Sequence, residues 1–200
     1  MDHNPQLHLA QPRQLISAAQ IASRVAALAD EINAQTADRP IHVVGVLRGA
    51  FVFMADLVRA LATNAACAPH THNDVRCDFL GVRSYGSATE SSGVLAITND
   101  LELPIAGQHV LLIEDIVDTG LTLRYLLDLL ETRHPASLRV CSLLNKPSRR
   151  RVEVPLDFFG FEVPDLFVVG YGLDYDQRYR NLPYIGVLPE PVRGGTAARP

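Results

Sequence analysis

A short apolar run that ends in acids constrains this chain more than any other stretch. Residues 110–113 are all apolar, and Glu114 and Asp115 follow them directly. Such a run is typical of a strand that is buried on both faces of a parallel sheet. Leucines then recur at helical spacing over residues 121–130, which predicts an amphipathic helix. The stretch therefore predicts a strand, a turn and a helix, with the turn at the carboxyl end of the strand.

This turn suits a ligand with two different ends. Open α/β sheets bind ligands at the carboxyl ends of their strands. The free N–H groups and the positive dipole end of the following helix favour a phosphate beside residues 118–122, which read Asp-Thr-Gly-Leu-Thr. Glu114 and Asp115 would repel that phosphate, so they are expected to face hydroxyls or a metal. A phosphorylated sugar has this layout.

The other periodic segments predict a doubly wound α/β fold. Helices are predicted over residues 17–35 and 50–61, and strands over 41–47, 75–82, 94–98, 138–144, 157–163 and 167–169. Strands alternate with helices over the first two thirds of the chain, and short strands follow. We therefore expect a parallel sheet with helices on both faces and a small hood built from the chain ends. Residues 1–200 would form one domain, with about 1–12 and 193–200 flexible.

Composition restricts the class of protein. The 200 residues are 48% hydrophobic and 20% charged, with a formal net charge of −4, which argues against a broad nucleic-acid surface. The apolar runs are too short to cross a membrane, and the first residues lack a signal-peptide layout. Neither the dinucleotide nor the P-loop glycine motif occurs. The sequence thus predicts a cytoplasmic enzyme with small-molecule substrates and no nucleic-acid or membrane partner.

Cations mark the ends of two further strands. Arg48 and Gly49 follow the predicted strand over 41–47, and an arginine beside a glycine at that position suits an anion. Lys146 follows the strand over 138–144. Residues 149–151 are three arginines, which are typical of a solvated edge more often than of a nucleic-acid site. The small, polar segment over 83–93 has the composition of a mobile lid.

These stretches resemble a known enzyme family. The pattern over residues 110–122 resembles the phosphoribosyl-pyrophosphate motif of type I phosphoribosyltransferases. Residues 46–57, 83–86, 143–147, 160–175 and 180–184 resemble the hypoxanthine (hypoxanthine-guanine) phosphoribosyltransferases. The resemblance covers roughly residues 40–190. It implies purine salvage, in which hypoxanthine or guanine reacts with phosphoribosyl pyrophosphate to give IMP or GMP and pyrophosphate.

The resemblance assigns the central stretch to the sugar phosphate. Glu114 and Asp115 would hold the ribose hydroxyls, directly or through Mg²⁺. Asp118 would act as the general base that takes the proton from purine N7 while N9 attacks. The 5′-phosphate would be wrapped by Asp118, Thr119, Gly120, Leu121 and Thr122.

The resemblance also assigns the pyrophosphate, the purine and the lid. Arg48, where many relatives have lysine, would bind pyrophosphate together with Gly49 and Arg180, and Asp174 would bind a Mg²⁺ that bridges it. Lys146 would donate to the 6-oxo group and so discriminate against adenine. Phe167 would stack on the purine, Val168 would offer backbone groups to its edge, and Ser84 and Tyr85 would close the lid. A homodimer or homotetramer is expected by the same analogy.

Two non-catalytic alternatives compete with this interpretation. One is a regulator that senses phosphoribosyl pyrophosphate and binds RNA through residues 149–151. The other is a signalling receiver domain in which the acids over 114–118 accept a phosphoryl group. The net acidity disfavours the first, and the second would leave residues 119–122 without a purpose.

Overall fold

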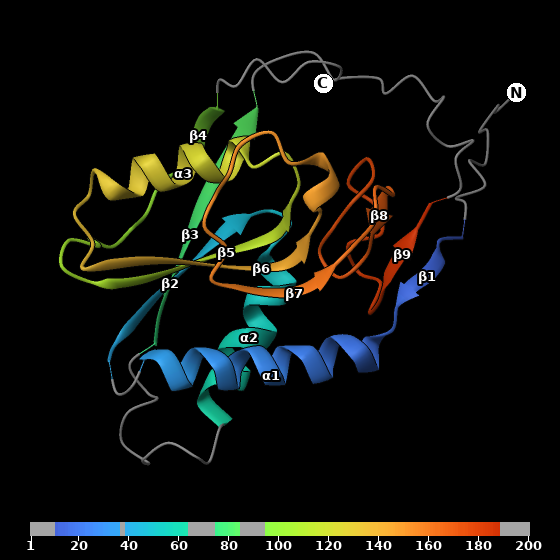
Figure 1. Ribbon diagram of the computed structural model, residues 1–200, viewed down its shortest axis with the longest axis horizontal. Helices are drawn as coiled ribbons and strands as arrows, with labels where there is room; N and C mark the ends of the chain where they lie inside the picture. The colour runs from blue at the N-terminus through green and yellow to red at the C-terminus, as the bar shows by residue number, and fades with distance from the viewer. Residues whose placement is uncertain (1–10, 37–38, 64–74, 85–94, 189–200) are drawn as a thin grey trace, which may run out of the picture.

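A six-stranded, mostly parallel sheet forms the centre of the computed structural model, which describes residues 11–36, 39–63, 75–84 and 95–188 (Figure 1). The elements are β1 (Arg13–Ile16), α1 (Ala18–Thr36), β2 (Ile41–Leu47), α2 (Phe51–Thr63), β3 (Val75–Ser84), β4 (Leu95–Asn99), β5 (His109–Val117), α3 (Leu121–Glu131), β6 (Ser137–Asn145), the 3₁₀ turn η1 (Pro147–Arg149), β7 (Phe158–Glu162), β8 (Val168–Val169) and β9 (Ile185–Val187). Among them, no helix is long and apolar enough to cross a membrane.

The strand order confirms the doubly wound prediction. The large sheet runs β4-β3-β2-β5-β6-β7, and every neighbouring pair is parallel except β3 with β4. Helices α1 and α2 cover one face and α3 covers the other (Figure 1). Each face has its own hydrophobic core, because the central strands are apolar on both sides.

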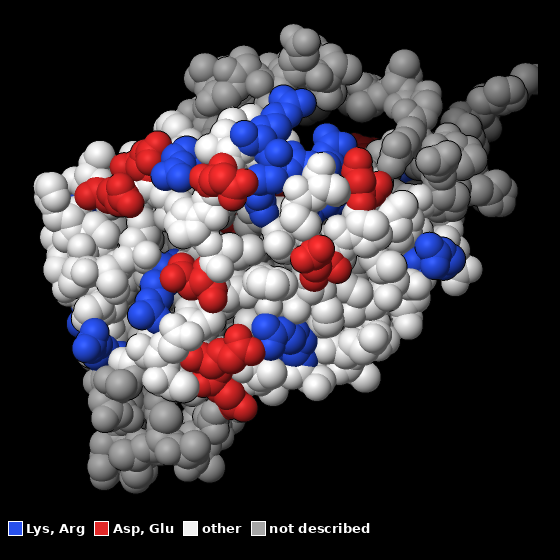
Figure 2. All heavy atoms as spheres, viewed as in Figure 1, with Lys and Arg blue, Asp and Glu red and all other residues white. Residues whose placement is uncertain are grey.

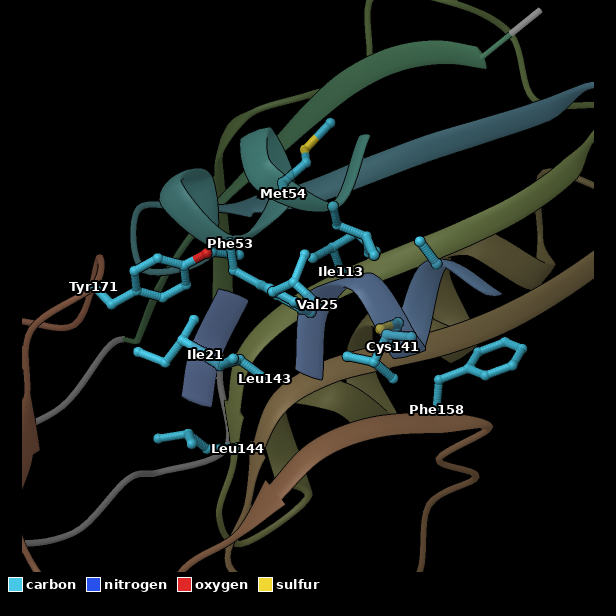
Figure 3. Close-up of a cluster of buried hydrophobic side chains, with 14 of the residues drawn as sticks. Ile21, Val25, Phe53, Met54, Ile113, Cys141, Leu143, Leu144, Phe158 and Tyr171 are labelled. Atoms are coloured by element: carbon cyan, nitrogen blue, oxygen red, sulfur yellow. The ribbon is translucent and has the colours of Figure 1, made fainter. Parts of the chain in front are cut away.

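The larger core lies between the sheet and helices α1 and α2. Ile21 and Val25 of α1 meet Phe53 of α2 over the inward side chains of β5 and β6, such as Ile113 and Leu143 (Figure 3). All five side chains are almost fully buried. The helical spacing of the apolar residues in α1, noted in the sequence, is what brings its buried stripe onto the sheet.

A small antiparallel sheet forms the expected hood. Its order is β1-β9-β8, so strands from both ends of the described chain lie side by side (Figure 1). The sequence did not predict β1 or β9 as strands. Each is only three or four residues long, which is too short to show an alternating pattern, and each forms by pairing with a segment elsewhere in the chain.

Strand β5 is longer than predicted. The predicted strand ended at residue 113, with the acids in the turn, whereas β5 continues to Val117 and contains both Glu114 and Asp115. Glu114 pairs with Ser142 of β6, and Val117 pairs with Asn145. Because β6 continues alongside, the polar residues stay in the ladder, and the turn begins only at Asp118.

Candidate active site

A cavity of about 400 Å³ opens at the carboxyl ends of β2 and β5. Eight of the residues predicted for the site line it, namely Arg48, Gly49, Glu114, Asp115, Asp118, Thr119, Gly120 and Thr122. Its apolar wall comes from Val46, Val82, Val117 and Leu123, together with Leu47 and Ile116. The structure therefore gathers two loops, separated by more than 60 residues in the sequence, around one volume.

The turn before α3 is shaped for close approach of a ligand to the backbone. Gly120 has φ 84°, in the left-handed region, and a Cβ there would lie 2.5 Å from the carbonyl oxygen of Val152. The N–H groups of Arg151 and Val152 both donate to the carbonyl of Thr119, at 2.9 and 3.2 Å. These two hydrogen bonds hold the turn in place. The first N–H groups of α3 have no acceptor within the helix, and the helix begins at the cavity.

Two acids stand together at the end of β5. Burial, and then the neighbouring charge of Asp115, raise the pKa of Glu114 well above its ordinary value. Burial likewise raises the pKa of Asp115 to about 6, although the backbone N–H of Ile116 and the charge of Arg180 oppose the shift. Burying carboxylates side by side is unfavourable in the free protein. The pair therefore suits a ligand that brings hydrogen-bond donors or a cation.

The Arg48 loop packs directly against these acids. A Cβ on Gly49 would fall 1.5 Å from Oδ2 of Asp115, so any larger residue here would displace the Asp115 carboxylate. On its other side, a Cβ on Gly172 would lie 2.2 Å from the carbonyl oxygen of Gly49. Two glycines thus allow the Arg48 loop to pack between β5 and the 170–180 loop, and the side chain of Arg48 is exposed at the cavity wall.

Asp118 offers a buried acceptor. Its Oδ1 atom is buried and receives no hydrogen bond from the residues that the structure describes. The Nε atom of Arg149 lies 3.1 Å away as an ion pair, but its N–H does not point at Oδ1, so the contact neutralises charge without supplying a hydrogen bond. An unsatisfied buried carboxylate oxygen is costly, and a ligand N–H would satisfy it.

Lys146 lies beside Asp118 because adjacent strands end together. Its backbone N–H donates to the carbonyl of Val117 at 2.9 Å. The side chain is buried, and its ammonium donates to the carbonyl of Leu166 at 3.0 Å, with a carboxylate oxygen of Asp165 at 3.8 Å. An ammonium has three donors, so Lys146 retains capacity for an acceptor on a ligand.

The residue predicted to stack on the purine is exposed. Phe167 keeps 40% of its surface accessible, although its neighbour Val168, in β8, is buried. Its ring meets Tyr175 edge to face, with centroids 5.6 Å apart and an interplanar angle of 89°. The exposed part of the Phe167 ring is open to contact with a ligand.

The remaining predicted residues form an ion pair on the 170–180 loop. Arg180 contacts Asp174 at 2.8 Å and donates to the carbonyl of Gly172 at 2.7 Å. Asp174 also accepts a hydrogen bond from the backbone N–H of Gln177. The charges of Arg180 and Asp174 both affect the pKa of Asp115, in opposite directions, which places this loop at the edge of the cavity.

The structure thus divides the predicted site into two groups. Leu121, Lys146, Phe167, Val168, Asp174 and Arg180 are not part of the cavity wall, and their contacts place Lys146 and Arg180 next to it. Tyr85 lies outside the described residues, as does the side chain of Ser84. The structure therefore describes the residues predicted to contact sugar, base and pyrophosphate, but not those predicted to form the lid.

Comparison with known proteins decides the family. Residues 13–176 match the family model described as phosphoribosyl transferase domain. The chain is 47% identical over 178 residues to the hypoxanthine-guanine phosphoribosyltransferase of Bacillus subtilis, covering 89% of this chain and 93% of the relative. It belongs to the hypoxanthine(-guanine) phosphoribosyltransferases. It is therefore an enzyme, and the alternative of a receiver domain is wrong.

Solved structures of this phosphoribosyltransferase family share the fold. A hypoxanthine-guanine phosphoribosyltransferase from Bacillus anthracis has a TM-score of 0.81 at 40% identity, covering 90% of this chain and all of that chain. A hypoxanthine phosphoribosyltransferase from Staphylococcus aureus has a TM-score of 0.83 at 37% identity, covering 96% and 98%. Both matches extend well beyond the central motif, so the overall fold is shared.

Two of the three arginines over residues 149–151 contact the site, which the interpretation of this run as a solvated edge did not include. Arg149 pairs with Asp118 and, at 3.5 Å, with Asp165, while Arg150 donates to the side chain of Asn145. On the described part of the face that Figure 2 shows, acidic side chains lie on either side of a group of basic ones. Arg149 and Arg151 therefore contact the site, through the side chain of Asp118 and the backbone of Thr119, and Arg150 contacts the end of β6. The one signal in the sequence for these contacts is that the run begins three residues after Lys146.

Proposed function

We propose that this phosphoribosyltransferase converts hypoxanthine, and guanine, with phosphoribosyl pyrophosphate to IMP or GMP and pyrophosphate. One observation carries the proposal: a buried acceptor on Asp118 and a buried donor on Lys146 lie at adjacent strand ends, beside a turn suited to phosphate. The relatives at 47% identity bear the names of hypoxanthine and hypoxanthine-guanine phosphoribosyltransferases, which supports the same substrates.

In this proposal, Asp118 moves the proton. The N9 atom of the purine forms a bond to C1′ of the ribose as the C1′–oxygen bond to pyrophosphate breaks. The bonding electrons leave with the pyrophosphate, and Oδ1 of Asp118 accepts the proton from N7. Its lack of a hydrogen-bond donor among the described residues suits this role, because the purine N–H is the donor it would receive.

Lys146 and Phe167 would bind and orient the base. A 6-oxo group accepts hydrogen bonds, whereas a 6-amino group would leave the buried ammonium of Lys146 without that acceptor. The exposed ring of Phe167 offers a stacking surface, and stacking does not require a hydrogen bond to the 2-substituent. We therefore expect hypoxanthine and guanine to be substrates and adenine to be excluded.

Arg48, Arg180 and the backbone beside Gly49 would bind the pyrophosphate. Charge builds on this leaving group in the transition state, so cations held in place before reaction stabilise it where it develops. Arg180 is fixed by its bonds to Asp174 and Gly172, whereas Arg48 is exposed. Of the two, Arg180 is the more preorganised.

The acids of β5 fit a magnesium ion. Hard carboxylate oxygens are the ligands that Mg²⁺ prefers, and a cation would relieve the crowded pair formed by Glu114 and Asp115. Among the described residues, no group of three or more potential ligands could hold a metal alone, as expected where substrate oxygens complete the coordination. Asp174 would hold a second ion through the pyrophosphate. When bound, Mg²⁺ would neutralise developing phosphate charge.

A purine panel tests this function. The protein is incubated with Mg²⁺, phosphoribosyl pyrophosphate and, separately, hypoxanthine, guanine, xanthine and adenine, and the nucleotides are separated by chromatography. IMP and GMP without AMP are expected. Product from adenine would contradict the role of Lys146, and no product from any base would contradict the function. We also propose a homodimer or homotetramer, which light scattering would test, and a cytoplasmic location.

A further inference from the structure

The 170–180 loop has an unusual backbone. Gly170, Tyr171 and Gly172 have φ values of 99°, 51° and 101°, three successive residues in a region that favours glycine. A bulky non-glycine residue rarely adopts this conformation and loses free energy when it does. Such strain persists only where surrounding contacts enforce it, and it is concentrated at ligand clamps and switch regions. Something must therefore hold Tyr171 in place.

A buried hydrogen bond supplies that restraint. The hydroxyl of Tyr171 donates to Oδ2 of Asp56, on α2, at 2.5 Å. Figure 3 shows the ring of Tyr171 reaching from the loop, with its hydroxyl directed toward α2. Tyr171 is only 6% exposed, and burial together with the Asp56 carboxylate raises the pKa of its hydroxyl. The tyrosine therefore remains a donor, and its bond to a charged acceptor is of the stronger kind.

The restraint lies at the root of the pyrophosphate-binding loop. Gly172, next to Tyr171, rests on the carbonyl of Gly49 and accepts a hydrogen bond from Arg180. The N–H groups of Tyr171 and Gly172 donate to the carbonyls of Leu182 and Arg180, at 2.8 and 3.0 Å. Moving Tyr171 would therefore move Arg180 relative to the Gly49 loop.

We propose that Tyr171 is a positioning residue for the pyrophosphate half of the site, acting through its hydrogen bond to Asp56. The bond fixes the 170–180 loop on α2 and so sets the distance of Arg180 and Asp174 from the Arg48 loop. Lys146 lies on another segment, and Phe167 precedes the loop, which it meets through its edge contact with Tyr175. The purine half should therefore depend less on this bond than the pyrophosphate half. This inference rests on the proposed function, because it takes Arg180 and Arg48 as pyrophosphate contacts.

Tyr171→Phe removes the hydroxyl and leaves the ring. We expect KM for phosphoribosyl pyrophosphate to rise about tenfold, the loss expected for a buried hydrogen bond to a charged group, while KM for hypoxanthine stays within about twofold. Tyr125→Phe is the matched control, because it removes the same atom from α3, whose Tyr125 packs against the other core. That variant should leave both constants unchanged.

A double-mutant cycle separates positioning from stability. Asp56→Ala should reproduce the effect of Tyr171→Phe, Asp56→Asn should restore part of it by keeping an acceptor oxygen, and combining Tyr171→Phe with Asp56→Ala should add little. Equal rises in both KM values, additive effects, or a fall in Tm with unchanged KM would overturn the inference.

The two proposals fail in different ways. If the unmodified protein converts no oxopurine, the proposed function falls. Calorimetric titration with phosphoribosyl pyrophosphate and Mg²⁺ then tests the positioning role on the same variants. Weaker binding in Tyr171→Phe than in Tyr125→Phe would support the role of Tyr171, and equal binding would refute it.

Discussion

At the scale of single residues, glycine positions decide whether the site can form. Gly120 and Gly107 both have positive φ, at 84° and 70°, but a Cβ on Gly120 would strike the backbone at 2.5 Å, whereas nothing lies within 4 Å of one on Gly107. Alanine at either position therefore adds similar backbone strain, but only alanine at position 120 would also collide with the carbonyl oxygen of Val152.

We expect Gly107→Ala to lower the free energy of unfolding by about 1 kcal/mol and to leave the rate unchanged. Gly120→Ala should lower it further and reduce kcat/KM for phosphoribosyl pyrophosphate about 100-fold, because the phosphate turn must shift. Urea unfolding and initial rates measure both effects. Equal losses of activity in the two variants would show that the collision with Val152 is unimportant.

The acids at the end of β5 cost stability in the free protein, and this cost grows as pH rises. The pKa of Glu114 is raised well above its ordinary value of 4.5 and that of Asp115 is raised from 3.8 to about 6. The folded state therefore binds more protons than the unfolded state between these values. The free energy of unfolding then falls as pH rises from the ordinary values through the raised ones.

Glu114→Gln should raise Tm of the metal-free protein at about pH 7.5 by roughly 2–4 °C, the change expected for about 1 kcal/mol in a domain of this size. The variant should also show a smaller difference in Tm between about pH 5.5 and about pH 7.5 than the unmodified protein. Differential scanning fluorimetry at both pH values measures this. Glu153→Gln, at an exposed loop position, is the control and should change neither. A lower Tm for Glu114→Gln at neutral pH would contradict the sign.

At the scale of elements, a buried aspartate ties the β3–β4 hairpin to the next turn. Asp78 of β3 is 5% exposed, and its Oδ2 accepts hydrogen bonds from the N–H groups of Glu102 and Leu103, at 2.9 and 3.0 Å. Asp78→Ala should cost about 1–3 kcal/mol of unfolding free energy, because those amides lose their acceptor inside the protein.

The matched control for that change is Asp100→Ala. Asp100 accepts from the N–H of Leu101 and pairs with Arg133, but it is largely exposed, so its removal should cost about 1 kcal/mol or less. Denaturant unfolding with an unchanged m-value would show that both act on stability alone. Similar costs for the two variants would mean that burial at Asp78 does not matter.

The elements also show how far sequence alone can predict this fold. The large sheet, three helices and the order of the site loops were all predictable, because apolar runs and helical spacing are local properties of the chain. The extension of β5 through Glu114 and Asp115 was not, since it depends on β6 running alongside. Strands β1 and β9 and the ion pair of Arg149 with Asp118 likewise arise from residues that are distant in sequence or lack a pattern.

At the scale of the whole molecule, substrate and metal should stabilise the protein together. The β5 acids and the phosphate turn lie in one cavity, so phosphoribosyl pyrophosphate bound with Mg²⁺ would neutralise the former and satisfy the latter. At about 100 times Kd this adds about 2.7 kcal/mol, or roughly 5–10 °C in Tm.

Chelation separates the two contributions. With excess EDTA, the same concentration of phosphoribosyl pyrophosphate should give less than about half of that shift, since the charge of the acids then opposes binding. Melting curves with and without the chelator measure the difference. An undiminished shift would contradict a magnesium site at Glu114 and Asp115.

The hood has a consequence for how the enzyme acquires activity. Arg13 pairs with Val187, so the small sheet closes a loop that contains almost all of the described chain. Contacts of such long sequence separation form late, because the entropy of closing the loop must be overcome first. During refolding, the far-UV circular dichroism signal of the helices should therefore recover before enzymatic activity does. A cell would for a time contain folded central sheets that cannot yet bind pyrophosphate.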